Sequence, residues 1–151
     1  MIKFKKVNES AVIPQKAGEN EVGFDLTAIK LDKVDGNINY FDTGIQVEPP
    51  NGYYLEIIPR SSIVKTGYIL ANSVGIIDPT YRGNIKIVLI RTNFNLPILT
   101  PPFCKCQLIV RKIYNFDSCV VDELSDTERG DGGFGSTDDK SKSKSAGYMM
   151  I

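Results

Sequence analysis

The side chains best suited to chemistry lie in one stretch, Leu70 to Gly83, which reads LANSVGIIDPTYRG. Asn72 offers an amide that both donates and accepts hydrogen bonds, Asp78 offers a carboxylate, and Tyr81 offers an aromatic ring. These three groups could read the edge of a base, orient a water molecule and pack on a sugar. An ordinary polar turn in a β-sandwich explains the same residues equally well at this point.

Local residue preferences predict the turn that would hold these side chains. Asp is favoured at the first position of a β-turn and Pro fixes φ at the second, so Asp78-Pro79-Thr80-Tyr81 should reverse the chain. The apolar residues on either side predict a short buried strand at 76–77 and a second strand over 84–92, buried on both faces. We therefore expect a β-hairpin with Asp78 in its turn.

Two further segments carry groups that bind anions. Pro59-Arg60-Ser61-Ser62 places a guanidinium and two hydroxyls at the start of a predicted helical turn, whose free amides are further donors. A helix cap beside a surface arginine is the alternative. The segment 129–137, RGDGGFGST, combines Arg129 with glycine amides, a ring and two hydroxyls, which suits phosphate. It lacks the ending of a Walker loop, and a flexible glycine-rich linker is the alternative.

Composition narrows the class of protein. The formal net charge of the 151 residues is zero, so we expect neither a nucleic-acid polymer nor a membrane as partner. No apolar run is long enough to span a bilayer, and the N-terminus lacks a signal-peptide pattern. Three cysteines fit a reduced intracellular protein, cytoplasmic or nuclear. Because histidine is absent, we expect no zinc site, and a general base must be a carboxylate, lysine, tyrosine or thiolate.

The elements that must position these groups are short strands separated by glycine and proline turns. This pattern predicts an all-β fold, an antiparallel jelly roll. Helix is limited to one or two turns at 61–66, with Ser61 as the cap and Gly67 as the terminator. Besides the two strands around Asp78, the alternation of apolar and polar residues predicts strands over 2–7, 22–29, 31–34, 38–41, 43–47, 53–58, 96–99, 107–113 and 119–123.

Three regions follow from the change in composition after residue 124. Residues 1–124 should form the catalytic jelly-roll core. Residues 125–137 should be a flexible glycine-rich arm, because so polar a segment cannot bury enough apolar surface to order itself. Residues 138–151 should be a disordered polar tail.

Five segments together resemble the five motifs of trimeric dUTPases, in the order and at the spacing of that family. The third and fifth are highly specific, whereas the first and fourth are short. In chain order the segments are Gly23-Phe24-Asp25-Leu26, Pro59-Arg60-Ser61-Ser62, Asn72 with Gly75 to Gly83, Gln107-Leu108-Ile109, and Arg129 to Thr137. The resemblance implies a jelly-roll homotrimer with its active sites at subunit interfaces. It also implies Mg²⁺-assisted hydrolysis of dUTP to dUMP and pyrophosphate, which keeps uracil out of DNA and supplies dUMP for dTMP synthesis.

The resemblance also implies a role for each residue. Asp78 is the carboxylate that orients and deprotonates the water attacking the α-phosphorus, and Asp25 holds magnesium through water, as suits an ion that keeps much of its hydration shell. Tyr81 packs against deoxyribose. The other implied substrate-binding residues are Asn72, Gly75, Ile76 and Ile77 at uracil, Arg60, Ser61, Ser62 and Gln107 at the phosphates, Arg129, Phe134, Gly135, Ser136 and Thr137 in the closing arm, and Lys86.

Three positions depart from the family pattern. Asp138 stands where the fifth motif ends in glycine, Cys104 stands where the fourth motif often carries arginine, and Val22 replaces a common alanine. Two alternatives remain open, a dCTP deaminase-like enzyme and a non-catalytic nucleotide-binding regulatory protein of the same fold. The glycine-rich arm and the Asp78 stretch both argue for the hydrolase.

Overall fold

The computed structural model describes residues 1–133 of the chain. The chain divides into two compact units, Met1–Asn115 and Phe116–Ile151. Within the described residues, every strand belongs to the first unit, and the only helix is one short 3-10 helix. The elements are β1 (Lys3–Lys6), β2 (Phe24–Ala28), β3 (Lys30–Asp35), β4 (Ile38–Asp42), β5 (Ile45–Glu48), β6 (Tyr53–Pro59), η1 (Ser61–Lys65), β7 (Tyr68–Leu70), β8 (Gly75–Ile77), β9 (Lys86–Arg91) and β10 (Phe103–Lys112).

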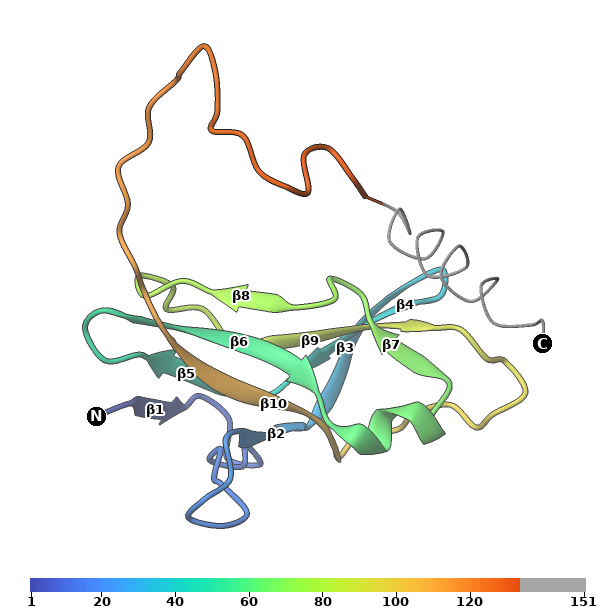
Figure 1. The fold of residues 1–151 in the computed structure, drawn as a ribbon. Helices are drawn as coiled ribbons and strands as arrows, with labels where there is room; N and C mark the ends of the chain where they lie inside the picture. Colours follow the sequence, from blue (N-terminus) through green and yellow to red (C-terminus); the bar gives the residue numbers. More distant parts are fainter. Residues whose placement is uncertain (134–151) are drawn as a thin grey trace, which may run out of the picture. The chain divides into compact units, whose positions relative to one another are not determined.

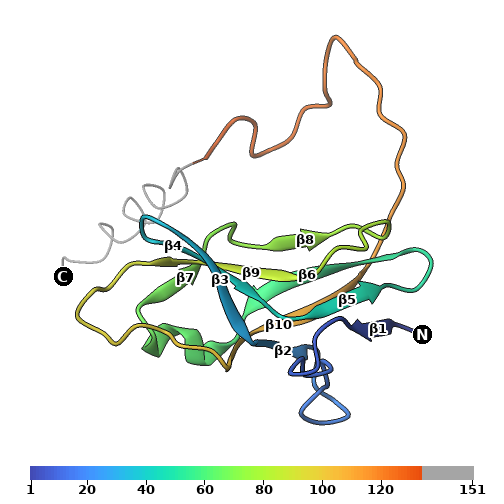
Figure 2. The same ribbon diagram turned by 180° about the vertical axis from the view of Figure 1, so that it is seen from behind.

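The strands of the first unit form three antiparallel sheets (Figures 1 and 2). One four-stranded sheet has the order β2-β10-β6-β8, the other has the order β3-β4-β9-β7, and β1 pairs with β5. All the strand pairings are antiparallel. The predicted all-β antiparallel jelly-roll class is confirmed.

The two four-stranded sheets share one hydrophobic core. Leu26 and Leu55 of the first sheet and Phe41 and Ile87 of the second are fully buried in the same cluster. The ring of Phe41 also packs edge-to-face on Phe103, with 4.8 Å between the ring centroids. Each such side chain contributes about 1.5–3 kcal/mol by leaving water, so the strands that carry the site have fixed registers.

The turn at Asp78 is confirmed, but the predicted hairpin around it is wrong. The Tyr81 N–H donates to the Asp78 carbonyl at 3.0 Å. However, β8 pairs with β6, whereas β9 pairs with β4 and β7 in the other four-stranded sheet. The chain from Asp78 to Ile85 therefore crosses between sheets. The short strand is also less buried than predicted, since Ile76 is 55% exposed.

Other local predictions are corrected by the structure. Residues 96–99 form no strand, because Pro97 lacks the N–H that a ladder needs. Residues 119–123 form none either, since no described strand pairs with their backbone. The strand β7 was not predicted, because three residues are too few to show a period. At η1, Arg60 is the N-cap residue in place of Ser61, and its side chain makes no capping hydrogen bond.

No helix among the described residues is long and apolar enough to cross a membrane.

Candidate functional site

The first group of predicted site residues gathers where β6 ends and β10 begins, and we call it the Arg60 cluster. It comprises Asp25, Arg60, Ser61, Ser62 and Gln107. Asp25 and Gln107 are register partners on β2 and β10. The Gln107 side-chain amide donates to the Pro59 carbonyl at 3.4 Å, next to Arg60. The fold therefore brings parts of the first, second and fourth motifs next to one another.

Arg60 is held by three separate partners. Its Nη1 forms an ion pair with Asp25 Oδ2 at 3.0 Å and donates to Cys104 Sγ at 3.1 Å, while its backbone N–H donates to the Lys105 carbonyl at 2.8 Å. The pKa of Arg60 is raised, mainly by the hydrogen bond to Cys104. Partial burial acts to lower it, and the negative charge of Asp25 acts to raise it. Cys104, which departs from the family pattern, is thus a direct partner of the guanidinium.

Gly23 has a steric role beside Gln107. A Cβ at this position would lie 2.1 Å from Gln107 Oε1 and 2.8 Å from its Cδ. Any other residue would displace the Gln107 side chain from the Arg60 cluster. The neighbouring Cys106 thiol is fully buried, and burial raises its pKa to about 12, so it stays neutral.

The second group comprises β8 and the residues on either side of it, and we call it the Asp78 loop. It comprises Asn72, Gly75, Ile76, Ile77, Asp78 and Tyr81. Asp78 is exposed and contributes to a groove of about 530 Å³ with Tyr54, Ile76, Pro79, Lys112, Ile113 and Tyr114. Asn72 packs against Gly75, where a Cβ would meet Asn72 Nδ2 at 3.2 Å. Ser73 has φ +58°, a conformation that is uncommon outside glycine and shapes the turn leading into β8.

Tyr81 folds back over Gly83. Its hydroxyl donates to the Asn84 carbonyl at 3.1 Å, and a Cβ on Gly83 would lie 2.3 Å from that hydroxyl oxygen. The ring remains 46% exposed. The absence of a side chain at Gly83 thus lets the Tyr81 ring hold a fixed position close to Asp78 while one part of the ring still faces solvent.

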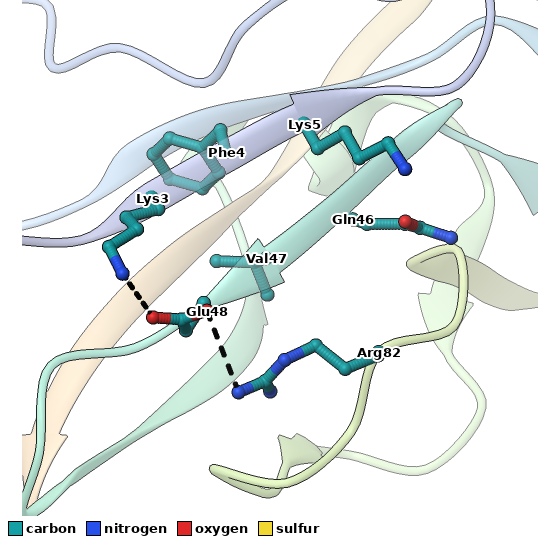
Figure 3. Close-up of a pocket in the computed structure, with 7 residues that line it drawn as sticks. All are labelled: Lys3, Phe4, Lys5, Gln46, Val47, Glu48 and Arg82. Atoms are coloured by element: carbon teal, nitrogen blue, oxygen red, sulfur yellow. Dashed lines mark hydrogen bonds and ion pairs between the residues drawn. The ribbon is translucent and has the colours of Figure 1, made fainter.

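Arg82 supports the same loop, and the sequence analysis did not identify it. Its Nη1 donates to the carbonyls of Pro79 and Tyr81, at 2.6 and 2.9 Å. Figure 3 shows Arg82 and Lys3 on two sides of Glu48 in a small pocket of about 240 Å³. An arginine directly after a predicted turn is the signal that could have suggested this contact. The pocket is formed by β1, β5 and Arg82 of the Asp78 loop. The sequence analysis did not predict that these segments lie side by side.

Arg60 and Asp78 of one chain lie toward opposite ends of β6, because β8 runs antiparallel to it and ends near the start of β6 (Figure 1). Ile77 pairs with Leu55, so Asp78 lies near Tyr54, with which it shares a groove. Arg60 is six residues further along, which at about 3.3 Å per residue is about 20 Å. The structure therefore leaves Asp78 and Arg60 apart in a single chain.

The remaining predicted residues lie elsewhere. Lys86 is on the other sheet and forms ion pairs with Asp32 and Asp42, at 2.8 and 3.2 Å. Partial burial of Asp42 acts to raise its pKa, but the hydrogen bond from the Gly44 N–H and the interaction with Lys86 together lower it. Arg129 belongs to the second unit, where its Nε donates to the Gly132 carbonyl at 2.8 Å. Phe134, Gly135, Ser136, Thr137 and Asp138 lie outside the described residues.

A metal ion would have few direct ligands in the described part of the chain. Residues 1–133 contain no group of three or more His, Cys, Asp or Glu side chains arranged to hold one. Asp25 fits the type of ligand that magnesium prefers, since it is a carboxylate whose side chain is 33% exposed.

Comparison with known proteins agrees with these motifs. The dUTPase family model matches residues 9–138. A deoxyuridine 5'-triphosphate nucleotidohydrolase of Clostridioides difficile is 38% identical over 138 residues, covering 90% of this chain and 96% of that protein.

Two solved structures have the same fold. A mutant Staphylococcus bacteriophage 80alpha dUTPase with dUpNHpp aligns with a TM-score of 0.73 at 20% identity, covering 91% of this chain and 98% of that one. A mutant dUTPase from phage phi11 of S. aureus, described with a coordinated structural Mg(II) ion, aligns with a TM-score of 0.66 at 16% identity, covering 83% of this chain and 99% of that one. From its motifs, its fold and these matches, the chain belongs to the dUTPase family.

Proposed function

We propose that this chain hydrolyses dUTP to dUMP and pyrophosphate by attack of water on the α-phosphorus. The observation that carries the proposal is the Asp78 loop, in which the exposed Asp78 carboxylate directly follows β8 and precedes the half-exposed Tyr81 ring. Membership of the dUTPase family supports the choice of nucleotide. This activity would limit the incorporation of uracil into DNA and supply dUMP for dTMP synthesis.

In this proposal, Asp78 is the general base. It hydrogen-bonds the attacking water, takes its proton as the oxygen bonds to the α-phosphorus, and the bond to the bridging oxygen breaks to release pyrophosphate. A general base must come within about 2.6–3.2 Å of the oxygen it deprotonates. The exposure of Asp78 leaves room for such a water.

Base and sugar recognition are assigned to the rest of the loop. Asn72, with the backbone of Gly75 to Ile77, would pair with the edge of uracil. Cytosine presents a donor where uracil presents an acceptor, so buried polar groups would be left unpaired with it. Tyr81, held by Asn84 and permitted by Gly83, would pack on the deoxyribose and leave no space for a 2′-hydroxyl.

The Arg60 cluster is assigned to the phosphates. Arg60, Ser61, Ser62 and Gln107 provide a guanidinium, two hydroxyls and an amide at one end of the sheet. Asp25 would hold Mg²⁺ through water, and when bound the ion would neutralise phosphate charge. Arg129 and the residues from Phe134 to Thr137 are assigned to the γ-phosphate and to stacking on the base. Lys86, with two carboxylate partners on the other sheet, stays a predicted substrate-binding residue without an assigned phosphate.

The distance between the two groups supports an active site shared between chains. Asp78 must reach a water at the α-phosphorus while Arg60 contacts the same triphosphate, and these two residues of one chain are about 20 Å apart along β6. We therefore propose a homotrimer in which the Asp78 loop of one copy completes the Arg60 cluster of another. An intracellular location is proposed with it, in keeping with three free thiols.

A nucleotide panel tests the proposal. Purified protein with Mg²⁺ is given dUTP, UTP, dCTP and dTTP, and monophosphate, pyrophosphate and ammonia are measured. We expect dUMP and pyrophosphate in equal amounts from dUTP and little product from the other three. Ammonia release from dCTP would instead identify a deaminase, and binding of dUTP without products would identify a regulatory protein.

A further inference from the structure

Lys105 lies within the phosphate side of the proposed site, although no motif includes it. On β10 the register with β2 passes from Cys104↔Thr27 to Cys106↔Leu26, so Lys105 occupies an irregularity in the ladder. Such a bulge redirects the side chain of the extra residue. Lys105 Nζ lies 3.4 Å from Ser62 Oγ, at hydrogen-bonding distance from a hydroxyl assigned to phosphate.

The backbone of Lys105 is tied to the same site. Its carbonyl accepts the Arg60 N–H at 2.8 Å, and the adjacent Cys104 Sγ accepts from Arg60 Nη1 at 3.1 Å. Lys105 therefore has a fixed position relative to both Arg60 and Ser62. The side chain is half-buried, which limits the number of rotamers it must give up on binding a ligand.

Lys105 differs from Arg60 in having no carboxylate partner among the described residues. Arg60 forms an ion pair with Asp25, and the charge of Glu21 also acts on it. Among residues 1–133, Lys105 takes part in no ion pair, whereas Lys86 has two carboxylate partners. Asp25 and Glu21 thus offset part of the positive charge of Arg60, whereas the charge of Lys105 beside the Ser62 hydroxyl is not offset by an ion pair in this part of the chain.

We propose that Lys105 is a further phosphate-binding residue, whose Nζ donates to a phosphate oxygen that the Ser62 hydroxyl also contacts. The inference rests on the proposed function and deepens it. Lysine binds phosphate as a point charge and donates up to three hydrogen bonds. Lys105 would then add a second cationic side chain to the Arg60 cluster, one that has no carboxylate partner within residues 1–133.

The test compares Lys105→Met with two matched variants of the full-length protein. Lys105→Arg keeps the charge at this position. Lys30→Met removes the same charge from an exposed position on β3, in the other sheet. Steady-state kinetics with dUTP and Mg²⁺ give KM and kcat, and calorimetry gives the affinity for a non-hydrolysable imido analogue of dUTP.

Losing one hydrogen bond to a charged group weakens binding by about tenfold. Lys105→Met should therefore raise KM for dUTP and weaken binding of the analogue by about that factor. Lys105→Arg and Lys30→Met should stay within about twofold of wild type. Raising the salt concentration should increase the KM of Lys105→Met less steeply than that of wild type, because one charge interaction is gone. The melting temperature without ligand should not fall, since the substitution removes a cation next to Arg60.

The outcomes separate this inference from the proposed function. If wild type hydrolyses dUTP and Lys105→Met has the KM, salt dependence and analogue affinity of Lys30→Met, Lys105 does not bind phosphate and the proposed function stands. If wild type releases no dUMP from dUTP, the proposed function itself fails. A lower melting temperature together with an equal loss in Lys105→Arg would show a structural role and overturn the inference.

Discussion

At the scale of single residues, the Asp78 loop combines an exposed reactive group with side chains held in place. Tyr81 is fixed by its hydrogen bond to Asn84 and by the absence of a side chain at Gly83. Arg82 holds the turn through two backbone carbonyls. The carboxylate of Asp78 is exposed beside these fixed groups, as expected of a group that must reach a water molecule.

Replacing Asp78 by Asn tests its role as the base. The amide has almost the same shape but cannot accept the proton of the water, so turnover should fall by about 10²–10⁴-fold while binding of a dUTP analogue is kept. Single-turnover rates and calorimetry measure the two quantities. Near-wild-type turnover in Asp78→Asn would mean that Asp78 is only a turn residue.

Replacing Tyr81 by Ala tests sugar discrimination. The variant should open space beside C2′ of the sugar, so the ratio of kcat/KM for UTP to that for dUTP should rise. Gly83→Ala is the matched variant, because its Cβ would push the same ring from its position without removing it. An unchanged ratio in Tyr81→Ala would place sugar discrimination elsewhere.

At the scale of elements, most strands could be predicted because alternate residues along them are buried. In β6, Leu55 and Ile57 face the core on either side of Glu56, and this alternation is visible in the sequence. The prediction that β9 is buried on both faces is wrong, since Val88 and Ile90 are only partly buried. The partner of each strand could not be predicted in the same way. β8 and β9 are close in sequence but join different sheets, because each pairs with strands that are not its neighbours along the chain.

The same limit applies to the candidate site. Asn72, Asp78 and Tyr81 could be predicted as one group because they lie within ten residues of each other in one turn-containing stretch. The contacts of Arg60 with Cys104 and of Lys105 with Ser62 join segments more than forty residues apart. They depend on the β6–β10 register and on a bulge, neither of which has a local sequence signal.

Removing the residues after Asp126 tests the proposed arm at this scale. The segment is polar and rich in glycine, so its loss should leave the melting temperature of the unliganded protein nearly unchanged. The truncated chain should still bind dUMP but hydrolyse dUTP far more slowly, because Arg129 and the Ser136 and Thr137 hydroxyls are gone. The rate of dUTP hydrolysis by Phe134→Ala should lie between those of the truncated chain and wild type, since base stacking contributes about 1–3 kcal/mol.

Two results would count against this assignment of the arm. Full dUTP hydrolysis by the truncated chain would show that the segment is dispensable for catalysis. A truncated chain that failed to fold would show that the segment belongs to the core.

At the scale of the whole molecule, the account depends on contact between copies of the chain. The two halves of the site lie at opposite ends of β6 in one chain, so a monomer could not place Asp78 and Arg60 on one triphosphate. Light scattering at micromolar concentration should therefore give the mass of a trimer. A monomer mass with activity intact would rule out the shared site.

The most direct test of this account mixes two inactive variants, Asp78→Asn and Arg60→Ala. Each should hydrolyse dUTP very slowly alone, and the two should be co-expressed or unfolded and refolded together so that mixed oligomers form. If each site takes Asp78 from one copy and Arg60 from another, random assortment restores about a quarter of the sites, and dUTP hydrolysis should return to about that fraction of wild type. Mixed oligomers of confirmed composition that release no more dUMP and pyrophosphate than the separate variants would contradict the account.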